Sequence, residues 1–299
     1  MNSNNNYKKM LQEAVAKKYK KRLLVDKLVT IFTVVCVIAA IIPLGSILLE
    51  VVKNGASAIS FEFLTQPQGS IGSGSGGVGP AIQGTIIVVG LASLIAAPVG
   101  VLTGIYLSEF AKGGIFPNLV RFFNDVLTGL PSIVIGIVGY IVIVLSIGSF
   151  SVLAGSISLS IIMMPIVVRV TEETLKIVPH SFREAGYSLG ISKAKITLFI
   201  VLPSAKNGIL TGIVIAISRI AGETAPLMMT ILGTSLFFTG ITGPVDALPL
   251  RIWRLASQPY ESAHAFGWGS ALILILMILA LSVGLRLLAQ KRSSFKGIT

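Results

Sequence analysis

Long, uninterrupted apolar stretches are the feature of this sequence that most constrains its fold. A helix that crosses a bilayer needs roughly 20 apolar residues, because each residue adds about 1.5 Å and the hydrocarbon core is about 30 Å thick. Six stretches meet this requirement: Leu28–Leu49, Gly84–Leu107, Val126–Ile147, Ser151–Val168, Asn207–Leu232 and Gly269–Leu288. The runs are continuous, unlike the alternating strands of a membrane β-barrel. They predict an all-α integral membrane protein with six transmembrane helices, in which Gly148–Phe150 is a tight turn between the third and fourth.

The charged residues are few and unevenly placed. They make up 12% of the chain, whereas an average soluble domain has about 25%. A net charge of +12 can indicate nucleic-acid binding, but eight of the 24 Lys and Arg lie between Lys8 and Lys27, ahead of the first span. We therefore expect membrane lipid, and no nucleic acid, as a partner. Whether this basic segment binds the anionic leaflet or only sets the topology stays open.

The positive charges also predict the orientation of the chain. Of the 24 Lys and Arg, 20 lie in the two ends and in the even-numbered loops, and only Lys53, Arg251 and Arg254 lie in the opposite loops. By the positive-inside rule, both termini are cytoplasmic in a multi-pass protein of the bacterial cell membrane. The expected division is a basic cytoplasmic segment at 1–27, a six-helix transmembrane domain at 28–290 with a cytoplasmic loop at 171–206, and a cytoplasmic tail at 291–299.

The sequence carries no constellation typical of an enzyme. It has no G-x-x-x-x-G-K-[ST] phosphate loop, so ATP hydrolysis of the P-loop kind is not expected of this chain. Cys36 is the single cysteine, and the two histidines, His180 and His264, fall on opposite sides of the predicted membrane. We therefore predict no catalytic residue, no metal ligand and no cofactor in this chain.

The loop at 171–206 is the most informative polar segment. Ser181 and Glu184 have the spacing of a capping box, which predicts the start of a short helix, and Gly190 predicts its end. A second helical stretch is expected from Ser192 to near Pro203. A plain helix connection needs about eight residues or fewer. The additional length predicts a helical hairpin that serves as a docking surface.

Two charges lie inside the fifth apolar stretch. Arg219 is 12 residues beyond Asn207, which is about 18 Å along a helix and costs at least about 2.5 kcal/mol in a bilayer. Glu223 is one turn further, so the two can pair. They are either a structural ion pair or an anion site, since a guanidinium binds phosphate through two parallel hydrogen bonds. Pro226 predicts a kink beyond them. Arg169, at the inner end of the fourth span, is explained by positive-inside anchoring, and a role in an anion path stays open.

The 171–206 loop resembles a known motif. Its pattern matches the E-A-A-x(3)-G-x(9)-I-x-L-P signature of permeases of ATP-binding-cassette (ABC) importers, with a glycine for the second alanine. The matching residues that the resemblance assigns to ATPase coupling are Glu184, Ala185, Gly186, Gly190, Leu202 and Pro203. The resemblance implies the type I ABC importer permease fold. It also implies a coupling helix at about Ser181–Gly190 that fits a separate ATPase subunit, with Glu184 as a cap, an ion-pair partner or both.

A second resemblance points to the substrate. Arg219–Pro226 is similar to the R-x-x-G-E-T-A-P motif of phosphate-importer permeases, in the form of their A-type subunit. Further similar segments are Gly79–Thr85, Ile105–Glu109 and Ala265–Trp268, and the resemblance runs from about Asp26 to Arg292. It implies an ABC importer for inorganic phosphate, with Arg219, Glu223 and Arg169 in the translocation path.

The same resemblance implies the partners. These are a second, homologous permease subunit of the C type, two ATPase subunits that bind ATP and magnesium, and an external phosphate-binding protein. The binding protein is expected on the external loops, including Leu248–Ser257, where Arg251, Trp253 and Arg254 recur at helical spacing. Two alternatives stay open: an ABC permease for another oxyanion, molybdate or sulfate, and a proton-coupled carrier that works without an ATPase and uses Glu223 as its proton site.

Overall fold

Helices form the regular structure of the described part of the chain, residues 3–69, 76–111 and 113–294 of a computed structural model. The chain divides into two compact units, Met1–Lys53 and Asn54–Thr299. The first unit lies in one continuous helix, α1 (Ser3–Gly55), whose apolar part is long enough to cross a membrane. The predicted first span, Leu28–Leu49, lies inside this helix.

The second unit contains the remaining helices. They are α2 (Phe61–Thr65), α3 (Gly79–Ile105), α4 (Ile115–Gly129), α5 (Ser132–Gly139), α6 (Leu145–Ile147), α7 (Val152–Ile177), α8 (His180–Ser188), α9 (Lys193–Ile196), α10 (Leu202–Ala221), α11 (Ala225–Thr230), α12 (Leu248–Ala256) and α13 (Glu261–Ser294). A 3-10 turn at Ala56–Ala58 precedes α2. Wider π-helical turns occupy Tyr106–Phe110, Tyr140–Val144 and Thr197–Val201.

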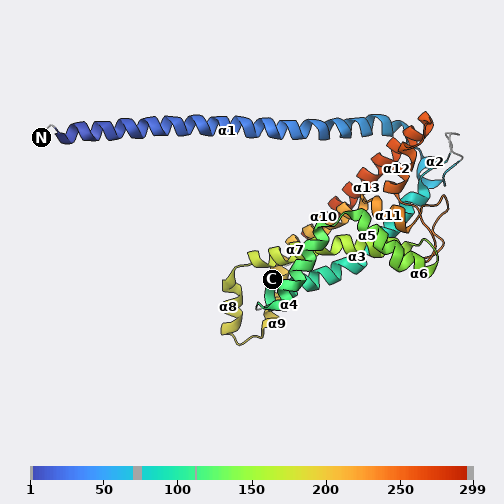
Figure 1. The fold of residues 1–299 in the computed structure, drawn as a ribbon. Helices are drawn as coiled ribbons and strands as arrows, with labels where there is room; N and C mark the ends of the chain where they lie inside the picture. Colours follow the sequence, from blue (N-terminus) through green and yellow to red (C-terminus); the bar gives the residue numbers. More distant parts are fainter. Residues whose placement is uncertain (1–2, 70–75, 112, 295–299) are drawn as a thin grey trace. The chain divides into compact units, whose positions relative to one another are not determined.

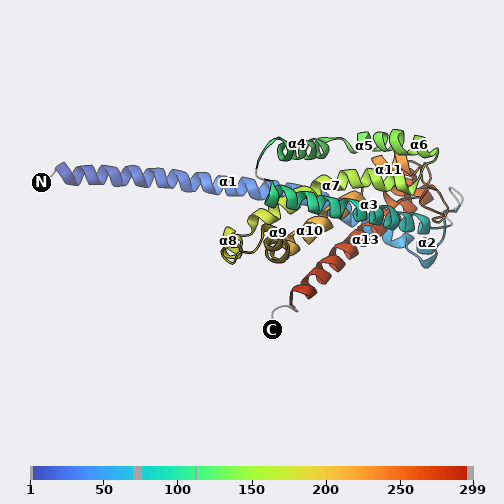
Figure 2. The ribbon, with the colours of Figure 1, turned by 90° about the horizontal axis from the view of Figure 1, so that it is seen from below.

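The centre of the unit is the packing of α3 against α7, which lie side by side in both views (Figures 1 and 2). Two glycines one turn apart permit the close approach. A Cβ atom on Gly100 would lie 2.8 Å from the Val167 Cβ atom, and one on Gly104 would lie 2.6 Å from the Thr171 Cβ atom. Small residues at this spacing let helix backbones pack closely in membranes. The apolar core between the helices includes Ala92, Ala96, Leu159 and Met163, which are fully buried.

The second, fourth and sixth predicted spans are confirmed, with longer helices than expected. They correspond to α3 with its π-helical turn, to α7 and to α13. The tight turn between the third and fourth spans is also confirmed: Gly148 has a positive φ of 76°, and the Ser151 side chain caps α7 by accepting from the amide of Ala154. Counting one bent pair as a single span, the described helices include six candidate membrane spans.

The predicted third span, Val126–Ile147, is wrong at its start. Residues 126–129 belong to α4, and the axis turns by 102° before α5 begins at Ser132. The break falls at Leu130–Pro131, both in extended conformations. The residue before a proline avoids the α conformation, and the proline cannot donate a backbone hydrogen bond. The candidate span is therefore the bent pair of α4 with the helical segment Ser132–Ile147, which contains α5, the π-helical turn and α6.

The predicted fifth span differs at both ends. A helical segment of 29 residues runs from Lys193 to Ala221, so the expected helix end near Pro203 is wrong. The π-helical turn Thr197–Val201 comes first, and Pro203 falls in the first turn of α10, where the missing amide hydrogen is tolerated. The chain then breaks at Gly222–Thr224, just before the kink expected at Pro226, and Pro226 is the second residue of the short helix α11.

The loop between α11 and α12 closes one end of the unit, opposite to α8 and α9 (Figure 1). Backbone carbonyls at the end of α11 and in this loop accept from the first amides of α7: Ser151 donates to Thr230 at 3.0 Å and Val152 to Gly243 at 3.1 Å. These amides have no partner within their own helix. The loop is therefore bound to the core by hydrogen bonds.

Candidate functional site

The two helix breaks border one small cavity. It has a volume of about 90 Å³ and is lined by Leu127, Thr128, Leu130, Ser132, Ile135, Ile162, Ile166, Arg219 and Glu223. Water occupies about 30 Å³ per molecule in the liquid, so the cavity has room for a small, partly hydrated ion. Irregular backbone at membrane depth is tolerated where it lines a cavity, and discontinuous helices form the substrate sites of many transporters.

Arg219 and Glu223 are the charged side chains that line the cavity. Arg219 lies in the last turn of α10, where a cation is favoured by the helix dipole. Its Nε atom lies 3.9 Å from Glu223 Oε1, and the two side chains are 56% and 17% exposed. The expected pairing is present, but the expected shared helix face is not, since Glu223 lies beyond the end of α10. A separation of 3.9 Å is longer than a hydrogen bond, so the guanidinium keeps donors available for another anion.

Residues from the middle of α7 line the same cavity as this pair. Ile162 and Ile166 lie near the centre of α7, while Ser132 opens α5 and adds a hydroxyl. Thr128 already donates its hydroxyl hydrogen to the carbonyl of Asn124 at 2.8 Å, which leaves its oxygen as an acceptor. The cavity thus combines one guanidinium, one carboxylate and two hydroxyls in an apolar wall.

The structure does not bring Arg169 into this cavity. Arg169 lies on α7 one turn from Ile166, which is about 4.5 Å along the axis. Its Nε atom lies 2.6 Å from Glu173 Oε1, and its Nη1 atom lies 3.8 Å from Asp125 Oδ1. Arg169 therefore has two carboxylate neighbours, while Arg219 has one distant carboxylate.

A short helix, α8, is present where the coupling helix is expected, but the predicted capping box is wrong. The helix begins at His180 with Pro179 as the N-cap residue, and no side chain caps it. Ser181 consequently lies within the first turn instead of before it. The predicted stop at Gly190 is confirmed, because this residue has a φ of 71° and its amide bonds to the carbonyl of Tyr187.

The motif residues on α8 divide into an exposed and a buried set. Glu184 and Ala185 are exposed, whereas Gly186 is buried. A Cβ atom on Gly186 would lie 2.7 Å from the Ile196 Cδ1 atom. The absence of a side chain at Gly186 thus lets α8 pack closely on α9. Further along, Leu202 is half-buried against the core below the loop and Pro203 is exposed.

Two ion pairs in this region were not foreseen. Arg183 of α8 binds Glu109 in the π-helical turn after α3, and this hydrogen bond raises the pKa of the Arg183 guanidinium. Arg121 of α4 donates to Glu172 of α7 at 3.0 Å and to the carbonyl of Leu107. Both pairs join residues far apart in the sequence, so local spacing gives no signal of them.

At the opposite end of the unit, Arg251 is buried, although the sequence analysis expects it on an exposed docking surface. Its side chain is 1% exposed and its Nε atom donates to Asp246 Oδ2 at 2.6 Å. Desolvation raises the pKa of Asp246 and lowers that of Arg251. Burial therefore disfavours the charged form of both side chains, and their mutual attraction opposes this effect. Arg254 donates to the carbonyl of Leu232, and Trp253 stays exposed.

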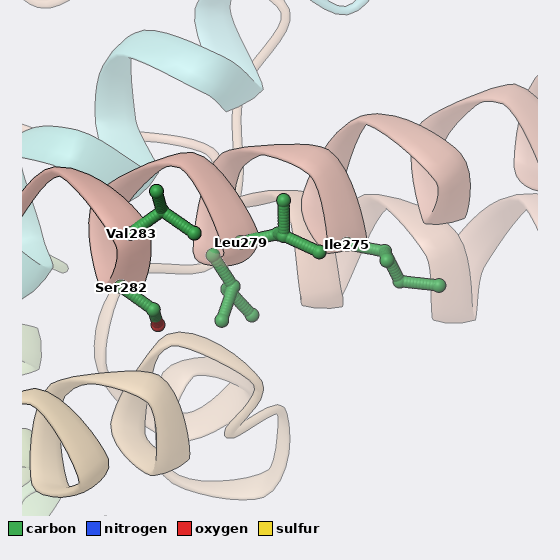
Figure 3. Close-up of a pocket in the computed structure, with 5 residues that line it drawn as sticks. Ile275, Leu279, Ser282 and Val283 are labelled. Carbon is green, nitrogen blue, oxygen red and sulfur yellow. The ribbon is translucent and has the colours of Figure 1, made fainter.

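A larger cavity is apolar and has no charged lining. It measures about 400 Å³ and is lined by residues of α13, namely Ile275, Ile278, Leu279, Ser282 and Val283 (Figure 3). Ser282 lies 3.2 Å from Ser218 of α10 through their hydroxyl oxygens. This surface offers no counter-charge to an anion.

Comparisons with known proteins give the family. Residues 96–294 match the model of the binding-protein-dependent transport system inner membrane component. The phosphate transport system permease protein PstA of Yersinia pestis is 35% identical, covering 94% of this chain and 96% of that protein. PstA of Haemophilus influenzae is 36% identical over 89% of this chain and 94% of that protein. A protein named probable phosphate transport system permease PstA, from Methanocaldococcus jannaschii, is 35% identical over 89% and 94%.

Solved structures of ABC importers share the fold of this chain. An inward-facing structure of the MetNI methionine ABC transporter aligns with a TM-score of 0.55 at 18% identity, covering 72% of this chain and 93% of that chain. An amino acid ABC transporter aligns with a TM-score of 0.51 at 20% identity, covering 72% and 94%. The chain therefore belongs to the binding-protein-dependent transport system inner membrane components, and within them to the PstA family of phosphate transport system permeases.

Proposed function

We propose that this chain is a permease subunit of an ABC importer for inorganic phosphate, with the cavity between the two helix breaks as part of its translocation path. The observation that carries this proposal is Arg219, a guanidinium that lines the cavity beside the middle of α7 and lies 3.9 Å from its carboxylate neighbour, without a hydrogen bond to it. The relatives named above are phosphate permeases, which favours phosphate over sulfate or molybdate as the cargo.

The charges of Arg219 and Glu223 favour weak, transient binding of phosphate over tight binding. Arg219 attracts the anion through its planar fork of donors. Glu223 lies close enough to oppose a bound anion, which keeps the affinity low. A translocation path requires binding that is strong enough for entry and weak enough for release.

Membership of this family implies ATPase and permease partners. We infer that the second permease is a homologous subunit of the C type, that two ATPase subunits supply ATP and magnesium, and that this chain itself is not catalytic. The exposed face of α8, with Glu184 and Ala185, is the surface that we assign to the ATPase. We infer that α8 and both termini lie on the cytoplasmic side, as the positive-inside rule predicts.

The opposite end is the surface that we assign to an external phosphate-binding protein. Arg251 is buried, so the docking surface uses the exposed Trp253 and the loop between α11 and α12. Docking there delivers phosphate to the outer end of the bundle. ATP binding by the partner subunits then moves the paired α8 helices and switches the path between its outward and inward openings.

The test is uptake of labelled phosphate by vesicles that hold the complete complex with its binding protein. The proposal predicts uptake that requires ATP and that unlabelled phosphate alone competes away. Stronger competition by sulfate or molybdate would keep the permease class and replace the substrate. Uptake that follows a proton gradient after ATP is depleted would overturn the proposal.

A further inference from the structure

One side chain of α8 joins three elements. Arg183 Nη2 donates to Glu109 Oε1 at 2.5 Å, and Arg183 Nε donates to Glu109 Oε2 at 3.1 Å. The same guanidinium donates to the carbonyls of Val178 at 2.8 Å and Leu175 at 3.0 Å. Leu175 lies in the last turn of α7, where carbonyls lack partners within the helix. Arg183 thus ties α8 both to the end of α3 and to the end of α7.

The pair is shielded from solvent. The side chains of Arg183 and Glu109 are 11% and 4% exposed. A guanidinium that binds a carboxylate through two parallel hydrogen bonds has a defined orientation as well as a strong attraction. The contact therefore resists rotation of α8 as well as its separation from α3.

The π-helical turn Tyr106–Phe110 presents Glu109 to this contact. Turns of this kind inside α-helices occur often at functional sites. The neighbouring Phe110 has the ammonium group of Lys193, the first residue of α9, 5.6 Å from its ring centroid. Both short helices of the 171–206 loop, α8 and α9, consequently contact the same turn, and Ile196 of α9 packs directly against Gly186 of α8.

We propose that Arg183 and Glu109 form the rigid link that passes a displacement of α8 to α3 and α7, the two helices at the centre of the bundle. This inference rests on the proposed function, in which the ATPase moves α8. Without the link, α8 could shift with the ATPase and turn about its two-residue connection to α7 while α3 stays in place. ATP would then be hydrolysed without a matching change of the translocation path.

The experiment uses the complete complex in vesicles with the single variants Arg183→Gln and Glu109→Gln and their double variant. Three quantities are measured: co-purification of the ATPase subunits, the rate of ATP hydrolysis, and the phosphate carried per ATP hydrolysed. We expect assembly and hydrolysis to persist while the phosphate carried per ATP falls at least roughly tenfold, the factor for one hydrogen bond to a charged group. The phosphate carried per ATP should fall no further in the double variant than in either single variant, because the two residues act as one unit.

Arg121→Gln is the matched control. It removes the same charge from an arginine that also pairs with a buried glutamate and a backbone carbonyl, but these two partners, Glu172 and Leu107, lie outside α8. Its phosphate carried per ATP should equal that of the unmodified complex. An unchanged ratio in both Arg183→Gln and Glu109→Gln, or loss of the ATPase subunits from both, would overturn the link. Absence of ATP-dependent phosphate uptake by the unmodified complex would instead overturn the proposed function.

Discussion

Gly136 of α5 lies directly against Pro226 of α11: a Cβ atom on Gly136 would be 2.7 Å from the Pro226 Cα atom. This contact joins the two helices that begin at the two breaks, and these breaks border the cavity that holds Arg219 and Glu223. The width of the cavity therefore depends on how closely α5 and α11 pack.

Gly136→Val should separate these helices. The nearest atom is backbone, so it cannot move away by a side-chain rotation, and overpacking of this kind costs about 1–3 kcal/mol. We expect a lower melting temperature of the purified complex and slower phosphate uptake. Gly90→Ala on α3 is the control, because no other atom lies within 4 Å of the added Cβ. A melting temperature for Gly136→Val equal to that of the control would contradict the close packing.

Arg219 and Glu223 should affect phosphate affinity in opposite directions. Arg219→Gln removes the donor fork and should raise the KM for phosphate roughly tenfold, the effect of losing one charged hydrogen bond. Glu223→Gln removes the opposing charge and should lower the KM. Uptake rates across a range of phosphate concentrations, at a fixed amount of binding protein, measure both. A rise of the KM in both variants would identify the pair as structural.

Arg169→Gln should change the KM less than Arg219→Gln does. Arg169 lies outside the cavity and already has Glu173 and Asp125 as neighbours. The same uptake series measures this difference. Equal effects of the two substitutions would place Arg169 on the path and would require the cavity to extend by one turn of α7.

Asp246 and Arg251 should behave as a coupled buried pair. Removing one partner leaves the other charge buried without compensation, which costs about 3–5 kcal/mol. We therefore expect Asp246→Leu or Arg251→Met alone to lower the melting temperature strongly. The double variant should recover much of the loss, because burial already disfavours both charges. Additive losses in the double variant would show that each residue is needed for a separate contact.

The sequence predicts the continuous helices well and the interrupted ones poorly. In α3 with its π-helical turn, in α7 and in α13 the apolar run falls on one unbroken helical segment, which extends beyond the run. At Leu130–Pro131 hydrophobicity continues across the break, so a hydropathy pattern cannot locate it. The proline itself is the available signal, since the residue before it avoids the α conformation.

The site was predicted in part. Arg219 and Glu223 are recognisable because ionisable residues inside an apolar run are costly. The cavity also needs Ser132 and Ile162 from other helices, and only the tertiary packing brings these residues together. The pairing of Arg183 with Glu109 spans 74 positions of the chain and follows from the way α8 folds back on α3. Neither periodicity nor spacing contains that information.

Glu184 should contribute to ATPase docking through its exposed position on α8. Glu184→Lys reverses the charge on the face that also carries Ala185, whereas the other side of the helix is held by Arg183 and Gly186. The substitution should therefore weaken binding of the ATPase subunits without unfolding the permease, and co-purification under rising salt measures it. Gly186→Ala is the comparison for the buried side of α8: its Cβ atom would lie 2.7 Å from both Cδ1 and Cγ1 of Ile196, so it should lower the melting temperature of the permease, whereas Glu184→Lys should leave the melting temperature unchanged. Unchanged co-purification of Glu184→Lys at every salt concentration would exclude this face of α8 as the docking surface.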